Sequence, residues 1–227
     1  MNDGYMKHIE HWVFDLDNTL YPAQNNLFSQ VDRRMGEFIS QRFDLPFEQA
    51  RARQKKYFKT YGTTLRGLMT EDDVAPQDFL NFVHDIDFDV LQENKDLNEA
   101  INNLRGDKVI YTNASRDYAV KVLGKLGLSG GFREIFDINS ASFKPKPDPG
   151  SYLKMIGDLG INPEKSVMIE DMARNLVPAR DLGMKTVWVR TEHECSGPKD
   201  SGDGYRADHI DYTTINLAEW LKRTVKD

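Results

Sequence analysis

The chain of 227 residues has one cysteine and no long apolar run. Cys195 can form no disulfide within the chain, which suits a reducing cytosol. No stretch approaches the roughly 18 apolar residues of a membrane-spanning helix. The first residues also lack the basic patch and apolar core of a signal peptide. We therefore expect a soluble, cytoplasmic protein with no membrane partner.

An excess of positive charge is also absent. The formal net charge is −6 and the isoelectric point is near 5.4, which argues against general binding of nucleic acid polymers. The five histidines show no zinc-ligand spacing. Hydrophobic residues make up 39% and charged residues 29%, a composition typical of globular proteins. This length fits one large domain or two smaller ones.

Polar residues follow one short apolar run near the start of the chain. Residues 12–14 are Trp, Val and Phe, and they are followed by Asp15, Leu16, Asp17, Asn18 and Thr19. An apolar run bounded by turn formers predicts a buried strand. Open parallel sheets bind ligands just beyond the carboxyl ends of their strands. Taken alone, the same five residues also fit an ordinary turn.

Two kinds of pattern divide the rest of the chain. Nearly all of residues 22–105 shows helical spacing with no strand signal, apart from an ambiguous segment at 88–92. Afterwards, helices alternate with segments that predict strands, and the predicted strands cover residues 108–113, 132–138, 166–169 and 185–190. This alternation predicts an α/β fold with a parallel sheet. We expect residues 191–209 to form a loop or flap.

The two patterns predict two domains. Residues 1–20 and 106–227 would form the α/β core, and residues 21–105 would form an inserted helical domain. Clefts between domains are favoured ligand sites.

Three predicted strands end in polar groups, and a lysine-containing loop lies between the last two. These groups are Asp15 and Asp17, Thr112 and Asn113, Glu170 and Asp171, and the loop 144–146. Four converging carboxylates would repel one another without a cation, and magnesium prefers oxygen ligands of this kind. A metal, an ammonium group, a hydroxyl and an amide around a free carboxylate suit phosphoryl transfer.

The ordered motifs resemble those of the haloacid dehalogenase (HAD) superfamily of phosphohydrolases. The four matches are DLDNT at 15–19, YTN at 111–113, the lysine loop, and IED at 169–171. The resemblance covers about residues 8–20 and 106–190. It implies a Rossmann-like parallel sheet with an all-helical cap inserted between the first two motifs.

The resemblance also implies a role for each motif residue. Asp15 would be the nucleophile that forms an aspartyl phosphate, and Asp17 the general acid and base. Thr112 and Asn113 would bind the phosphate. Magnesium (Mg2+) would be the cofactor, and its ligands would be Asp15, the main-chain carbonyl of Asp17, Asp171 and, directly or from beside the metal, Glu170.

Two lysines compete for the role of the third motif, which the resemblance implies is to hold the charge. Related sequences place this lysine before a proline and six residues before an aromatic that opens the next helix. Lys146 precedes Pro147 and lies six residues before Tyr152, so we favour Lys146 over Lys144.

The text DLDNTLYP, together with YGTTLRGL at 61–68, resembles pyrimidine 5′-nucleotidases of this superfamily. Tyr61, Thr64 and Arg66 are our candidates for facing the substrate cleft, where an aromatic could stack on a base and an arginine could bind a phosphate or a carbonyl. The alternative is that Tyr61 is a core residue and Arg66 is solvated. We expect a phosphomonoesterase acting on small phosphorylated metabolites such as pyrimidine nucleoside monophosphates, as a monomer or homodimer.

Other functions remain open at this stage. The dehalogenases of the superfamily lack the second aspartate, because a halide leaving group needs no proton, so Asp17 argues against their chemistry. A sugar phosphomutase or sugar phosphatase would keep both aspartates. Two alternatives belong to other functional classes. One is a non-catalytic phosphate-binding regulator, and the other is an interaction protein that uses the loop at 191–209.

Overall fold

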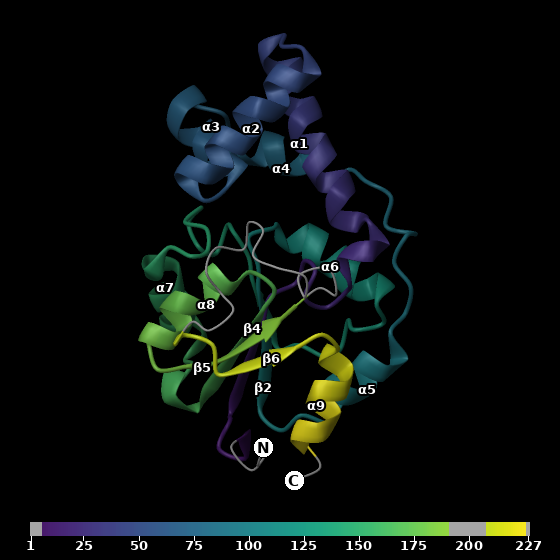
Figure 1. Cartoon of the computed structure of the whole chain (residues 1–227), viewed down its shortest axis with the longest axis vertical. Helices are drawn as coiled ribbons and strands as arrows, with labels where there is room; N and C mark the ends of the chain where they lie inside the picture. Colours follow the sequence, from purple (N-terminus) through teal and green to yellow (C-terminus); the bar gives the residue numbers. More distant parts are fainter. Residues whose placement is uncertain (1–5, 191–207, 226–227) are drawn as a thin grey trace.

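The computed structural model describes residues 6–190 and 208–225. Most of the predicted loop or flap at 191–209 therefore lies outside the described residues. The centre of the molecule is a parallel sheet of six strands in the order β3-β2-β1-β4-β5-β6 (Figure 1). The strands are β1 (His11–Phe14), β2 (Asp107–Tyr111), β3 (Glu134–Phe136), β4 (Ser166–Glu170), β5 (Lys185–Val189) and β6 (Tyr212–Thr214). This confirms the predicted α/β parallel-sheet fold.

The first predicted strand lies in the middle of the sheet. In β1, Phe14 is aligned with Ile110 of β2 on one side and with Ile169 of β4 on the other. The polar residues that follow these three strands therefore meet at one edge. The predicted strands are confirmed, but the short edge strand β6 was missed because its Tyr-Thr-Thr sequence is only partly buried.

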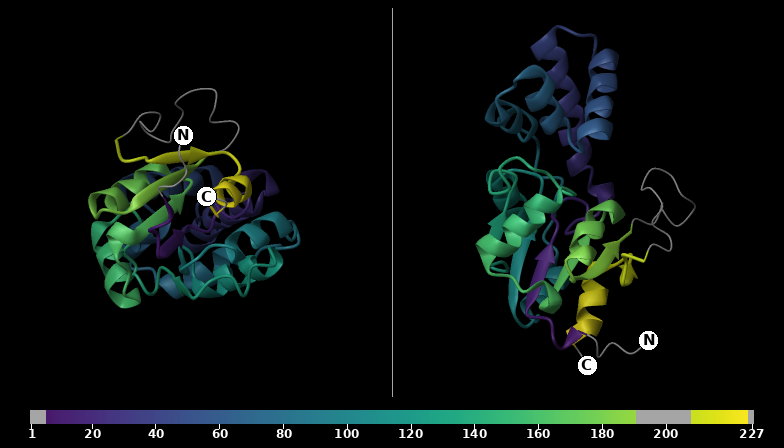
Figure 2. Two further views of the ribbon diagram at one scale, coloured as in Figure 1. Left: turned by 90° about the horizontal axis from the view of Figure 1, so that it is seen from below. Right: turned by 90° about the vertical axis from the view of Figure 1, so that its left-hand side faces the viewer.

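Helices cover both faces of the sheet (Figure 2). Side chains alternate between the faces along each strand, so Phe14 packs in one apolar cluster and Val13 in another. The first cluster includes residues of α5 (Lys95–Asn102), α6 (Arg116–Lys125) and α9 (Leu217–Val225). The second includes residues of α7 (Pro149–Leu159) and α8 (Ala173–Asp181). Among the described residues, no helix is long and apolar enough to cross a membrane.

A separate group of helices stands above the carboxyl edge of the sheet (Figure 1). It consists of α1 (Leu27–Phe43), α2 (Phe47–Tyr61), α3 (Thr64–Asp72) and α4 (Pro76–Val83), which we call the cap. α2 packs on both α1 and α3, and α1 also packs on α4. Thr63 begins α3 by accepting a hydrogen bond from the Arg66 amide at 3.2 Å.

The last helix of the predicted helical insert lies apart from the cap. α5 packs against α9 beside the sheet rather than with the cap helices. Residues 88–92, which were ambiguous in the sequence, form neither a helix nor a strand. The division at residues 21 and 105 stays a prediction, but the cap as we define it ends at α4.

Candidate active site

A cavity of about 420 Å³ is lined by residues from the carboxyl edge of the sheet and from the cap. Its core side contains every polar strand-end residue singled out from the sequence, together with Lys146 of the lysine loop. These residues are Asp15, Asp17, Thr112, Asn113, Lys146, Glu170 and Asp171. Residues separated by more than 150 positions in sequence thus come together as predicted, although their chemical roles stay predictions.

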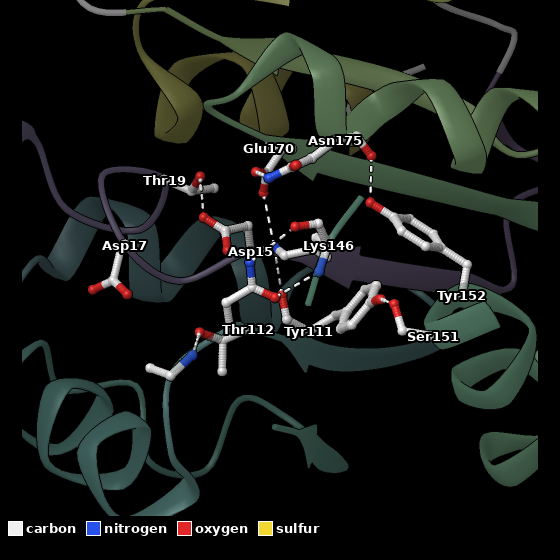
Figure 3. A network of polar contacts seen from close by, with 12 residues as sticks. Asp15, Asp17, Thr19, Tyr111, Thr112, Lys146, Ser151, Tyr152, Glu170 and Asn175 are labelled. Atoms are coloured by element: carbon white, nitrogen blue, oxygen red, sulfur yellow. Dashed lines mark hydrogen bonds and ion pairs between the residues drawn. The ribbon is translucent and has the colours of Figure 1, made fainter. Parts of the chain in front are cut away.

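Lys146 is the central cation of the site (Figure 3). It is only 2% exposed, and its ammonium group donates to three oxygens. These are Asp15 Oδ1 at 2.6 Å, the Tyr111 carbonyl at 2.9 Å and Glu170 Oε2 at 3.0 Å. Burial alone would lower the pKa of Lys146, but the Asp15 and Glu170 carboxylates raise this pKa above its ordinary value. Lys146 is therefore charged at neutral pH.

The backbone around Lys146 is held by Asn113. The Asn113 side-chain oxygen accepts from the Lys146 amide at 2.8 Å, and its side-chain nitrogen donates to the Lys146 carbonyl at 3.3 Å. Lys144, the competing lysine, is exposed and does not line the cavity. The structure thus brings Lys146, and not Lys144, to Asp15. It also gives Asn113 a positioning contact that the sequence did not suggest.

Asp15 is buried and fixed through both carboxylate oxygens. Oδ1 accepts from Lys146, and Oδ2 accepts from the Thr19 hydroxyl at 3.0 Å. The Asp15 amide donates to the Ile169 carbonyl at 2.9 Å, which continues the pairing of β1 with β4. The Thr112 hydroxyl accepts from the Ala114 amide at 3.0 Å, so its own proton is available for another acceptor.

Asp15, Glu170 and Asp171 each offer a carboxylate oxygen within 4.8 Å of the others. Both Glu170 oxygens accept hydrogen bonds, one from Lys146 and one from Asn175. Burial raises the pKa of Glu170 above its ordinary value, the nearby Asp15 charge adds to this effect, and the Lys146 charge opposes it. Within the described part of the chain, the Asp171 carboxylate has no hydrogen-bond or salt-bridge partner. Asp171 is therefore freer than Glu170 to hold a cation.

Asp17 is held by two tyrosines that sequence reasoning missed. Its Oδ1 atom accepts hydrogen bonds from the Tyr21 hydroxyl and, at 2.7 Å, from the Tyr118 hydroxyl. Burial, and secondarily the Asp15 charge, raises the pKa of Asp17 to about 6. An aspartate with this pKa can carry a proton near neutral pH. Tyr21 lies four residues after Asp17, a local signal, whereas Tyr118 comes from α6.

The three predicted cap residues have different locations. Thr64 is buried and lines the cavity. Tyr61 does not line it, and its hydroxyl donates to Glu71. Arg66 also lies outside the lining and forms a salt bridge with Asp148 at 3.2 Å. The structure therefore does not bring Tyr61 and Arg66 to the cleft as we expected.

Other cap residues form the upper wall of the cavity. This wall is mostly apolar, with Asp32, Gln54 and Lys55 among its polar members. Its apolar side chains are Phe28, Val31, Met35, Phe58, Leu65, Phe79, Leu80 and Val83. Opposite it, Arg174 of α8 also lines the cavity, three residues after Asp171. Helical periodicity could have located the apolar faces, but it does not show that these faces meet the strand ends.

A profile described as "Haloacid dehalogenase-like hydrolase" matches residues 12–189 of this chain. Among curated proteins, the chain is similar to phosphate metabolism protein 8 of Saccharomyces cerevisiae, with 23% identity over 191 residues. That alignment covers 76% of this chain and 59% of the yeast protein. The chain thus spans about three-fifths of the length of this relative.

Solved structures resemble the fold over nearly the whole chain. The HAD phosphatase from Thermococcus onnurineus matches with a TM-score of 0.62 and 19% identity, covering 95% of this chain and 97% of that chain. The Bacillus subtilis HAD-hydrolase YfnB bound to magnesium matches with a TM-score of 0.59 and 17% identity, covering 97% and 100%. An L-2-haloacid dehalogenase from Xanthobacter autotrophicus matches with a TM-score of 0.55 and 17% identity. This match covers 94% of this chain and 97% of that chain. At these identities the likeness establishes the fold alone.

Proposed function

The chain belongs to the haloacid dehalogenase-like hydrolase family, and from the geometry of its cavity we propose that it is a magnesium-dependent phosphomonoesterase. The observation that carries this proposal is the presence of Asp17, with its raised pKa, in the same cavity as Asp15. An oxygen leaving group needs a proton, and Asp17 can supply it. A halide leaving group would need none.

The donor set fits a magnesium ion. Two carboxylates and a main-chain carbonyl are oxygen ligands of the kind that magnesium prefers, and substrate phosphate and water complete its usual coordination. We assign Asp15, Asp171 and the Asp17 carbonyl as ligands, and we assign Glu170 to holding Lys146 beside the metal. When bound, magnesium would neutralise charge on the phosphate oxygens. The similar structure of YfnB is bound to magnesium, which supports the choice of this ion.

The chain's own residues divide the remaining chemistry. Thr19 and Lys146 orient the Asp15 carboxylate, which attacks phosphorus and forms an aspartyl phosphate. Asp17 donates its proton to the leaving oxygen. It then takes a proton from the water that attacks the phosphorus, which releases phosphate and restores Asp15. Thr112 and Asn113 bind the phosphate oxygens during both steps, and the positive charge of Lys146 stabilises the charge on those oxygens.

We propose small phosphate esters whose leaving group carries a planar ring, and pyrimidine nucleoside 5′-monophosphates first among them. The apolar upper wall supports this choice because it suits a flat ring better than a polyhydroxylated sugar. The motif text DLDNTLYP and YGTTLRGL supports it independently.

The test is release of phosphate from a panel of phosphate esters in the presence of magnesium. We expect turnover of uridine or cytidine monophosphate, loss of activity with a chelator, and loss in Asp15→Asn. Asp181→Asn, an exposed aspartate at the end of α8, is the matched control and should keep full activity. Activity that survives in Asp15→Asn would refute the nucleophile, and halide release from a 2-haloacid without any phosphatase activity would refute the reaction.

A further inference from the structure

Arg174 is a cation in the cavity, and its guanidinium has no anionic partner in the part of the chain that the structure describes. It lies in the first turn of α8, and no hydrogen bond or salt bridge of its guanidinium is found within the described ranges. Its Nε atom is buried and has no hydrogen-bond partner among the described residues. A buried donor that stays unpaired destabilises the folded protein. Such a donor in a cavity wall is suited to an acceptor that a ligand brings.

The cap residue Phe58 holds this guanidinium from the other side. The central carbon of the Arg174 guanidinium lies 4.6 Å from the centre of the Phe58 ring. This cation–π contact uses the face of the guanidinium and leaves its N–H edge free to donate. Phe58 itself is 42% exposed although it lines the cavity, so it retains surface that a ligand can cover.

Two other arginines give a contrast with Arg174. Arg53 also stacks on an aromatic ring, Phe43, at 4.1 Å, but it forms a salt bridge with Asp72. Arg180 belongs to the same helix as Arg174 and is paired with Asp211 at 2.8 Å. These two arginines have carboxylate partners, whereas Arg174 contacts an aromatic ring and lines the cavity.

We infer that Arg174 determines which leaving group the enzyme accepts, by donating from its N–H edge to a carbonyl oxygen on a planar ring of the substrate. This inference rests on the proposed phosphomonoesterase function and adds the residue that selects the substrate. With the phosphate at Asp15 and Lys146, the rest of the molecule extends toward the apolar upper wall. A flat ring packs against that wall, and its carbonyl supplies the acceptor that Arg174 lacks.

A substrate with a planar ring fits these surroundings better than a sugar phosphate without one. The cap side of the cavity is lined mainly by apolar side chains such as Phe28, Phe58 and Phe79, and its polar members include Asp32, Gln54 and Lys55. The apolar side chains stabilise a planar ring but give no hydrogen-bond partners to the hydroxyls of a bare sugar. The expected class is therefore a phosphate ester whose leaving group bears a carbonyl-containing heterocycle, such as a nucleoside monophosphate.

The experiment compares two kinds of ester in the wild-type enzyme and in Arg174→Gln. Nucleoside monophosphates carry the ring carbonyl, and phenyl phosphate carries a ring with no acceptor oxygen. Because hydrogen bonds to charged groups contribute about 1.5–3 kcal/mol, we expect KM for the best nucleotide to rise at least tenfold in the variant. The value of kcat/KM for phenyl phosphate should change less than about threefold. Arg174→Lys keeps the charge but not the planar fork, and it should recover only part of the nucleotide preference.

Arg180→Gln is the matched control, because it makes the same change on the same helix outside the cavity. It should leave the ratio of nucleotide to phenyl phosphate turnover unchanged. Phe58→Leu tests the same contact from the cap and should raise KM for the nucleotide without lowering kcat for phenyl phosphate. If Arg174→Gln changes both esters equally, or if the wild type prefers phenyl phosphate to every nucleotide, the inference is overturned while the proposed function stands. If the wild type hydrolyses no ester, the proposed function itself fails.

Discussion

The two walls of the cavity are built in opposite ways. On the core side, the buried Lys146 ammonium donates to Asp15, to Glu170 and to the Tyr111 carbonyl, which uses all three of its donors. On the cap side, the wall is mostly apolar, and two of its phenylalanines, Phe28 and Phe58, are partly exposed. Rigid, fully paired groups suit chemistry that is the same for every phosphate ester. An apolar, adaptable surface suits the choice of leaving group.

The comparison predicts that core-side substitutions affect every substrate, and the largest effect is expected at Lys146. Lys146→Met removes the cation between Asp15 and Glu170 and leaves two buried acids uncompensated. Breaking a buried ion pair in this way costs about 3–5 kcal/mol. We expect the free energy of unfolding in urea to fall by this amount and phosphatase activity to fall at least a thousandfold. Lys144→Met should change neither by a measurable amount, and equal losses in the two variants would contradict the assignment of Lys146.

The junction between the walls should respond to pH through His84. His84 ends α4, lies 3.0 Å from the Ser115 hydroxyl and stacks on Tyr118 with ring centres 4.3 Å apart. Burial, assisted by the Lys121 charge, lowers the pKa of His84 to about 4. The charged groups around it are Arg34, Asp78, Asp85, Asp117 and Lys121.

In the unfolded chain this histidine binds a proton near pH 6.5, whereas in the folded chain it does so only near pH 4. The contribution of neutral His84 to stability is therefore complete above pH 6.5. It is lost as the pH falls toward 4. Between pH 7 and pH 5 we expect wild-type unfolding free energy to fall by about 2 kcal/mol more than that of His84→Gln. The control is His8→Gln, at an exposed histidine, which should keep the wild-type dependence of unfolding free energy on pH. If His84→Gln also keeps the wild-type pH dependence, this prediction is contradicted.

A smaller effect, confined to the rate, is expected at Tyr118. Tyr118→Phe removes one of the two hydroxyls that hold Asp17 Oδ1. We expect kcat to fall about tenfold for nucleotide and phenyl phosphate alike, since a misplaced proton donor slows the reaction of every ester. Tyr152→Phe removes a buried hydroxyl that lies away from Asp17, on the opposite face of the sheet, and is the control for lost hydrogen bonding. A loss restricted to one of the two esters would place Tyr118 in leaving-group selection instead.

The same contrast explains how far the sequence could lead. Asp15, Thr112 and Asp171 follow apolar strands, and a parallel sheet brings strand ends to one edge, so these residues could be predicted locally. Lys146 could be chosen over Lys144 from its place before Pro147. Tyr118 lies 101 residues from Asp17, and nothing in the spacing of its helix marks it as a hydrogen-bond donor to the site.

The cap side could not be predicted in this way, because its geometry depends on how whole helices pack above the sheet. Phe58 and Arg174 have ordinary positions in amphipathic helices, and only the tertiary arrangement brings the two side chains together across the cavity. The placement of α5 beside α9 has the same origin. Helical periodicity identified the helix but not the domain with which it packs.

The smallest predicted effect distinguishes a contact between the walls from a contact with substrate. Arg66 joins the cap to Asp148, two residues after Lys146, in a salt bridge whose side chains are 39% and 30% exposed. Pairs this exposed contribute about 0–1 kcal/mol. Arg66→Gln should therefore change kcat/KM for nucleotides less than about threefold, and Asp148→Asn should do the same. The sequence had suggested that Arg66 binds the substrate, which would require a tenfold or larger rise in KM in Arg66→Gln but not in Asp148→Asn. Kinetics of the two single variants and the double variant decide between these roles, since a simple ion pair makes the double variant no worse than either single one.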